Sequence, residues 1–244
     1  MMYKTKAIIL RSVKYGETSL VVTAYTALFG VQTYMVNGVR SAKKSGLKAA
    51  LYQPASVLET EVYHNERNTM HRIRECSPAH VFKNVLTDVV KNSIAVFMME
   101  ILYKLLKQPE ANTELFDFCE DILLKLDDAG PGIAANFPLF IALHLSHFFG
   151  FRIDDNYSET NNILDLQEGN FTELQPAHLY FLSGEDAFIT AEILKIRIPE
   201  ELDQLKMNHL KRRELLRKYM DFYSLHIQGF GQMKTLAVMQ EVLS

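Results

Sequence analysis

Four positive side chains fall on one short stretch of the sequence. The stretch 37–48, NGVRSAKKSGLK, mixes its cations with glycine and serine, and these cations are Arg40, Lys43, Lys44 and Lys48. Such a composition is typical of a solvent-exposed loop. Several cations on one loop suit a polyanion, because they can follow spaced phosphates without a fixed geometry. The stretch therefore predicts a contact with nucleic acid, and a solvated hairpin loop without a function is the alternative.

Further cations lie on predicted strands and turns near this loop, namely Arg11, Lys14, Arg72 and Arg74. Tyrosines are interspersed with them at positions 15, 34, 52 and 63. Phosphate attraction and aromatic stacking are the two ingredients of sequence-tolerant binding to single strands. Tyrosine packs equally well on strand faces, so one or two of the four are expected to contact a base. The predicted role of the cations is to neutralise the phosphates of two strands and so reduce the repulsion that opposes annealing.

Motifs for covalent or phosphate-transfer chemistry are missing from the sequence. The patterns GxSxG, GxxxxGK[ST] and GxGxxG do not occur. His144 and His147 are three residues apart on a predicted helix, but without a third ligand at a recognisable spacing they indicate core-edge histidines rather than a metal site. Cys76 and Cys119 are predicted to be small buried apolar residues. The expectation is a protein that is not an enzyme and has no cofactor, with a hydrolase built from scattered residues as an alternative.

A second candidate site lies on the predicted helix 208–227. One arc of this helix is apolar, and Arg212 falls inside that arc. The ordinary interpretation is a helix with a solvated basic face. The sharper one is a groove whose apolar floor and neighbouring arginines take an acidic peptide that ends in an aromatic residue. Its candidate residues are Arg212, Arg213, Leu216, Arg217 and Tyr223.

Composition and charge set the broad class of the protein. Of 244 residues, 48% are hydrophobic and 23% charged, which is ordinary for a globular protein. The first residues, MMYKTKAIIL, predict no secretory signal, no apolar run reaches the ~20 residues of a membrane span, and two distant cysteines fit a reducing cytoplasm. Residues 1–80 carry a formal charge of +6 and residues 81–244 one of −9. This asymmetry predicts two modules with separate partners.

The periodicity of apolar residues changes at about residue 80. Before it, alternation predicts five short strands that suit a small barrel, at 3–10, 20–25, 31–36, 57–63 and 70–76. After it, three-and-four spacing predicts a helical bundle with helices at 85–107, from a cap at Asn112 or Thr113 to 126, from a cap at Asn136 to 150, at 179–182, 185–196, 208–227 and 233–243. Residues 151–178 are predicted to be irregular, with one short ribbon near 163–166. The predicted class is α+β, with a barrel domain at 1–80 and an all-α domain at 81–244.

In this order the parts resemble the RecO family of bacterial recombination mediators. The segments that carry the resemblance are KAIILRSVKYGETSLVVTAYTALFG with its Tyr15-Gly16-Glu17 turn, VNGVRSAKKS, LYQPASVLETEVYH and RRELLRKYMDFYSLHIQGFGQMKTLAVMQEVL. Each motif alone is degenerate, but together they follow the family in order over most of the chain. Many members carry a four-cysteine zinc module after the third bundle helix, whereas residues 151–182 here contain no cysteine. A metal-free version of that segment is therefore implied.

The resemblance implies an OB-fold barrel, binding to single- and double-stranded DNA, strand annealing, and help in loading RecA onto DNA covered by single-strand-binding protein, together with RecR. It also implies that the helical domain contacts the acidic carboxy-terminal tail of single-strand-binding protein. A cytoplasmic, nucleoid-associated protein with no membrane partner is expected. The alternative is an adaptor whose barrel binds other proteins and no DNA.

Overall fold

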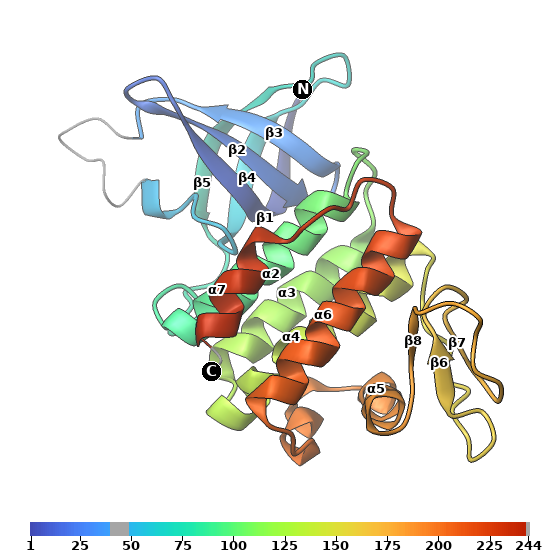
Figure 1. The fold of residues 1–244 in the computed structure, drawn as a ribbon. Coiled ribbons are helices and arrows are strands. Elements are labelled where there is room, and N and C mark those ends of the chain that lie inside the picture. The colour runs from blue at the N-terminus through green and yellow to red at the C-terminus, as the bar shows by residue number, and fades with distance from the viewer. Residues whose placement is uncertain (40–48, 243–244) are drawn as a thin grey trace. The chain divides into compact units, whose positions relative to one another are not determined.

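The structure, a computed structural model, describes residues 1–39 and 49–242 (Figure 1). By its packing the chain divides into two compact units, Met1–Asp128 and Ala129–Ser244. The first unit therefore includes two helices that follow the barrel. The predicted domain boundary near residue 80 stays a prediction.

Five strands close into a barrel at the amino terminus (Figure 1). Their order around the barrel is β1–β2–β3–β5–β4, β4 pairs with β1, and the β3–β5 pair is parallel while the others are antiparallel. The strands are β1 (Met2–Tyr15), β2 (Ser19–Thr26), β3 (Gly30–Val36), β4 (Val57–Tyr63) and β5 (His71–Pro78). A five-stranded barrel that precedes a helical region is the predicted class, which is confirmed.

Alternation along the strands separates a buried inner face from an outer face. Ile9, Val22 and Tyr34 are buried in the barrel core, each flanked along its strand by outward positions. Strand β1 has a bulge between Ile9 and Arg11, where its register against β2 shifts by one residue. An extra residue in one strand reverses the alternation beyond it. Arg11 is consequently opposite Thr23 on the outer face.

Two helices of the first unit follow the barrel, α2 (Val89–Leu105) and α3 (Thr113–Asp128). The Asn112 side chain accepts a hydrogen bond from the backbone N–H of Leu115 at 3.0 Å, which confirms the predicted cap. The ring of Tyr25, on β2, packs 5.7 Å from that of Phe116, and its hydroxyl donates to the Asn112 carbonyl at 2.8 Å. These contacts attach α3 to the barrel wall.

The connection from β5 to α2 winds around one buried carboxylate. Asp127, at the end of α3, is 6% exposed and accepts backbone N–H bonds from Lys83 at 2.9 Å and from Asn84 and Val85 at 2.7 Å. Burial alone would raise the pKa of Asp127, but the three backbone donors lower it overall. The connection is thus fixed to α3 by a charged acceptor.

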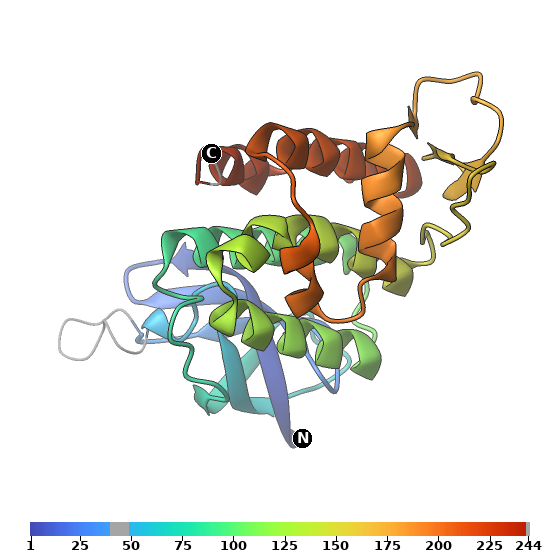
Figure 2. The ribbon, with the colours of Figure 1, turned by 90° about the horizontal axis from the view of Figure 1, so that it is seen from below.

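The second unit is a helical bundle with a small sheet attached. Helix α4 (Pro131–Ser146) lies at its centre and packs against α5 (Glu185–Lys195), the 3-10 segment η2 (Pro199–Gln204) and α6 (His209–His226). Figure 2 shows α5 running crosswise to α6. The unit also contains η1 (His147–Phe149), the strands β6 (Ile163–Asp165), β7 (Asn170–Thr172) and β8 (Phe181–Leu182), and α7 (Lys234–Val242).

One segment of this unit, Pro131–Phe149, is long and apolar enough to resemble a membrane span by length and composition. Inside the protein, 61% of that window is buried. The helix has a core position, which accounts for its apolar composition on all sides.

Two helix predictions in this unit are wrong, the start of one helix and the existence of another. Helix α4 begins at Pro131 after Gly130, so Asn136 lies inside it and is buried instead of capping it. The Asn136 amide donates to the carbonyls of Leu202 and Leu205, both at 3.0 Å, so a tertiary contact and not a cap satisfies it. The segment 179–182, predicted helical, contributes β8, because Leu182 pairs with Leu164 of β6.

Candidate nucleic-acid interface

The outer face of β1, β2, β3 and β5 includes two of the cations predicted to bind DNA, Arg11 and Arg72. Across this face, the register aligns Val13 with Val21, Val21 with Met35, and Met35 with Arg72. Neighbouring strands are about 4.8 Å apart, so the row extends over roughly 15 Å along the curved wall. Arg11 lies on the same face, two residues before Val13. The barrel register therefore brings cations from distant parts of the sequence to one surface.

Arg72 and Tyr63 form a cation and an aromatic ring side by side. They are register partners on β5 and β4, and Tyr63 is 51% exposed. Within the part of the chain that the structure describes, no acidic side chain lies at ion-pair distance from Arg72, which is itself exposed. An uncompensated guanidinium next to an open ring offers both phosphate attraction and base stacking.

The end of β1 provides a further exposed cation and a further exposed ring, which point to opposite faces of the strand. Lys14 is exposed, and no ion-pair partner for it occurs among residues 1–39 and 49–242. Its neighbour Tyr15 is 59% exposed and lies at the turn into β2. The loop after β1 is one of the loops with which OB-folds contact oligonucleotides.

Two other predicted phosphate ligands are already engaged within the protein. Arg11 donates to the hydroxyl of Tyr103 on α2 at 3.2 Å, and its guanidinium carbon lies 5.5 Å from the centre of that ring. Arg74 forms ion pairs with Glu61 at 3.3 Å and with Glu75 at 3.9 Å. Lys4 also pairs with Glu61, at 3.2 Å. A phosphate that approaches Arg74 must therefore compete with two carboxylates, whereas Arg72 has no such competitor among the described side chains.

The predicted basic loop is not covered by these observations. Arg40, Lys43, Lys44 and Lys48 lie outside the described residues. Their part in DNA binding stays a prediction from the sequence.

Two of the four tyrosines predicted as stacking platforms are in the barrel core. Tyr34 is 1% exposed and Tyr52 is 5% exposed. Burial raises the pKa of the Tyr34 and Tyr52 hydroxyls above the usual range. Tyr15 and Tyr63 remain as the exposed candidates, and their contact with a base stays a prediction.

Helix α6 in the second unit contains the predicted peptide-binding residues. Arg213 and Arg217 are exposed. Leu216 is 5% exposed, and Tyr223 is fully buried with its hydroxyl donating to the Ala142 carbonyl at 2.7 Å. These last two side chains therefore belong to the core of the unit and do not form an open floor.

Arg212 borders a cavity of about 450 Å³. Its Nε donates to the Asn136 side chain and one terminal nitrogen donates to the Met207 carbonyl, both at 2.8 Å. Burial lowers the pKa of this guanidinium. No carboxylate pairs with it among residues 129–242, so it is a half-buried, fixed cation suited to a carboxylate ligand.

The histidines of α4 and η1 pack within the protein. The rings of His144 and Phe140 are 4.0 Å apart, and His144 Nε2 lies 3.3 Å from the Ile193 carbonyl. Burial lowers the pKa of His144 to about 4. Across the described residues, no group of three or more His, Cys, Asp or Glu side chains is placed to hold a metal ion, and Cys76 and Cys119 are free thiols.

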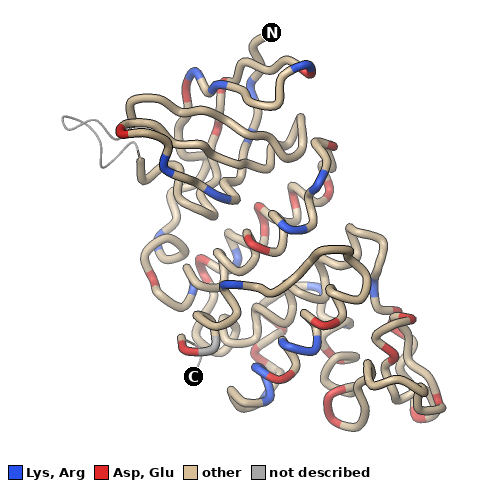
Figure 3. Tube along the Cα trace, turned by 45° about the horizontal axis from the view of Figure 1, so that its top comes forward, with Lys and Arg blue, Asp and Glu red and all other residues tan. Residues whose placement is uncertain are grey.

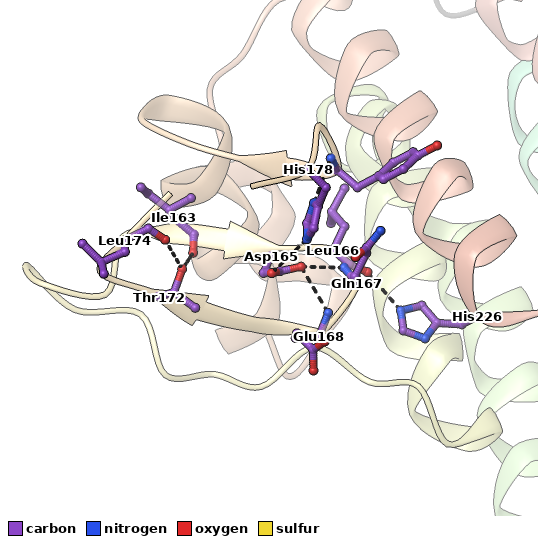
Figure 4. Close-up of polar contacts among 10 residues, drawn as sticks. Ile163, Asp165, Leu166, Gln167, Glu168, Thr172, Leu174, His178 and His226 are labelled. Atoms are coloured by element: carbon purple, nitrogen blue, oxygen red, sulfur yellow. Dashed lines mark hydrogen bonds and ion pairs between the residues drawn. The ribbon is translucent and has the colours of Figure 1, made fainter. Parts of the chain in front are cut away.

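Hydrogen bonds organise the cysteine-free segment 151–182 (Figure 4). Buried Asp165 accepts the backbone N–H groups of Gln167 at 2.7 Å and Glu168 at 3.2 Å, and one of its oxygens lies 3.2 Å from His178 Nε2. The segment has six acidic residues against one arginine, and Figure 3 shows acidic positions along it. Such a surface repels phosphates and other anions.

Comparison with known proteins covers almost the whole chain. The family model described as Recombination protein O N terminal matches residues 1–82, and the one described as Recombination protein O C terminal matches residues 86–236. Proteins named DNA repair protein RecO from Flavobacterium johnsoniae and Flavobacterium psychrophilum are each 32% identical over the full length of both chains. The protein of the same name from Phocaeicola vulgatus is 30% identical, also over both full lengths.

Proposed function

The chain belongs to the RecO family of DNA repair proteins, and on this basis we propose that it is a DNA-binding mediator that anneals complementary strands. It binds single- and double-stranded DNA through the outer face of the barrel. It works with RecR to help load RecA onto single strands covered by single-strand-binding protein. Its place of action is the cytoplasm, at the nucleoid, and its role is non-catalytic.

The observation that carries the proposal is the pairing of exposed cations with exposed tyrosines on the barrel. Arg72 is the register partner of exposed Tyr63, and exposed Lys14 and Tyr15 lie at the end of β1, on opposite faces of the strand. Cations that bind backbone phosphates fix position without reading sequence, as annealing of any complementary pair requires. In this proposal the four cations of the 37–48 stretch add further phosphate contacts.

The second unit supplies the contact with single-strand-binding protein in this proposal. The acidic carboxy-terminal tail of that protein binds at the cavity of Arg212, with the exposed Arg213 and Arg217 adding attraction along the helix. Leu216 and Tyr223 support the helix from the core. Charge-assisted hydrogen bonds from a fixed guanidinium suit a terminal carboxylate.

An annealing assay tests the proposal. Two complementary oligonucleotides, one carrying a donor dye and the other an acceptor dye, are mixed with and without the protein, and the rate of energy transfer is followed. We expect the protein to raise the rate, and a variant with Arg40, Lys43 and Lys44 all changed to Glu to raise it less. Unchanged annealing by the variant would remove the basic loop from the site.

The same assay separates this function from that of an adaptor. A protein that binds RecR but neither accelerates annealing nor retains DNA at low salt would be an adaptor without direct DNA contact. That outcome would overturn the proposed mechanism.

A further inference from the structure

A groove opens in the barrel wall where β3 and β5 separate. Their pairing, as far as the structure describes it, consists of Tyr34 with His71 and Met35 with Arg72. Strand β3 ends at Val36, whereas β5 continues to Pro78. The resulting cavity has a volume of about 480 Å³. This size falls within the roughly 300–1,000 Å³ of small-molecule sites.

The floor of the groove is apolar and anchored. It includes Val39, Leu51 and Ile73, which also contact the barrel core. Buried Tyr52 closes it, with its hydroxyl 3.0 Å from the Cys76 sulfur and its carbonyl accepting a hydrogen bond from Ser12. A floor fixed in this way is a preformed surface that needs little ordering on binding.

The rim of the groove is polar, with two arginines and one carboxylate, Glu75, which pairs with Arg74. Arg72 and Arg74 lie along the β5 side, and Asn37 lies at the end of β3. Arg72, which has no carboxylate partner in the described chain, is also part of the proposed phosphate-binding face. A DNA strand held by that face therefore runs past the opening of the groove.

A nucleobase matches this combination of an apolar slot and a polar rim. Its flat faces are apolar, its edge carries hydrogen-bonding groups, and a guanidinium plane can stack on it. We infer that the β3–β5 groove holds one unstacked base of a single strand, an inference that rests on the proposed DNA binding. Bases of a duplex are already paired and stacked, and removing one has an energetic cost. The groove thus favours single strands over duplexes at the same number of phosphate contacts.

Strands without bases test whether any base contributes to binding, and variants that fill the groove separate the groove from the exposed rings of Tyr15 and Tyr63. Wild-type protein is titrated with a fluorescently labelled natural single strand and with an equally long strand of abasic residues, which keeps the phosphates. We expect the abasic strand to bind about tenfold or more weakly, because stacking one base contributes on the order of a tenfold affinity change. Equal affinities that both fall with salt would overturn the base pocket and leave the proposed DNA binding intact. No binding of either strand at low salt would instead refute the proposed function itself.

Filling the groove gives a second, independent test. Leu51→Trp and Met35→Trp place an indole against its lining, and Leu28→Trp is the matched control on an exposed turn outside it. Circular dichroism and thermal melting establish that each variant is folded, and Met35, on a strand, tolerates an aromatic residue well. We expect both groove variants to lower the ratio of natural-strand to abasic-strand affinity about tenfold, and Leu28→Trp to leave that ratio unchanged. Losses of the same size for natural and abasic strands would contradict the inference.

Discussion

The contrast between Arg72 and Arg74 gives a sharp prediction about the barrel face. Both residues are exposed on β5, two positions apart, but only Arg74 pairs with Glu61 and Glu75. Neutralising a phosphate on a single strand contributes about −0.7 to the slope of log affinity against log salt. At 0.1 M salt one such contact amounts to 0.7 log units, or about a fivefold change in affinity. Arg72→Gln should therefore weaken single-strand binding about fivefold and reduce the magnitude of the slope by about 0.7.

Arg74→Gln is the matched control, with the same change on the same strand. The ion pairs of Arg74 with Glu61 and Glu75 keep its guanidinium from a full phosphate contact. Removing this charge therefore weakens only a longer-range attraction to DNA, which salt screens over about 10 Å at 0.1 M. We expect less than about a twofold loss. Fluorescence anisotropy of a labelled oligonucleotide at four salt concentrations measures both quantities. An unchanged slope for Arg72→Gln, or a larger effect from Arg74→Gln, would refute this assignment of the interface.

Three further predictions concern the fold that supports the two candidate sites. Asp127→Ala should lower the unfolding free energy of the first unit by at least about 3 kcal/mol in urea titrations, because three backbone N–H groups lose a charged acceptor. A loss below about 1 kcal/mol would show that the Asp127 carboxylate does not hold the β5–α2 connection in place. Gly30→Ala should lower the unfolding free energy by about 2 kcal/mol or more in the same assay, since Gly30 has φ +62° and an added Cβ would clash with the Glu110 backbone carbonyl. Wild-type stability would show that the turn relaxes. Burial lowers the pKa of His144 in the folded protein to about 4, from the usual 6.5. As the pH drops, the unfolded chain therefore takes up a proton before the folded protein does. The unfolding free energy should fall between pH 6.5 and pH 4, by up to about 3 kcal/mol. His144→Phe should remove most of that pH dependence, and a persisting loss would assign it to other groups.

The parts of the fold that depend on local pattern were predictable. Strand β3 alternates in burial as it alternates in sequence, and the helix predicted at 208–227 is present as α6, which begins after Asn208. The predicted helix start at Asn136 is wrong, although an asparagine before an apolar run usually indicates a helix cap. Here Asn136 lies inside α4, and its amide donates to the backbone carbonyls of Leu202 and Leu205. The helix predicted at 179–182 is wrong because the strand there, β8, has only two residues, too few for a detectable periodicity.

The candidate sites were predictable in residue type but not in environment. Sequence alone could not show that Arg74 faces Glu61, since that contact depends on the register between β4 and β5. It also could not show whether the apolar arc of the last long helix lines an open groove or packs into the core, where the structure places Tyr223. The β3–β5 groove had no signal in the sequence, because it arises where two strands distant in the chain stop pairing.

The salt dependence of single-strand binding tests the central claim most directly. A labelled oligonucleotide is titrated with the wild-type protein at several salt concentrations, and log affinity is plotted against log salt. Neutralisation of roughly four phosphates predicts a slope near −3. An affinity that does not change with salt, or no binding at low salt, would contradict the account.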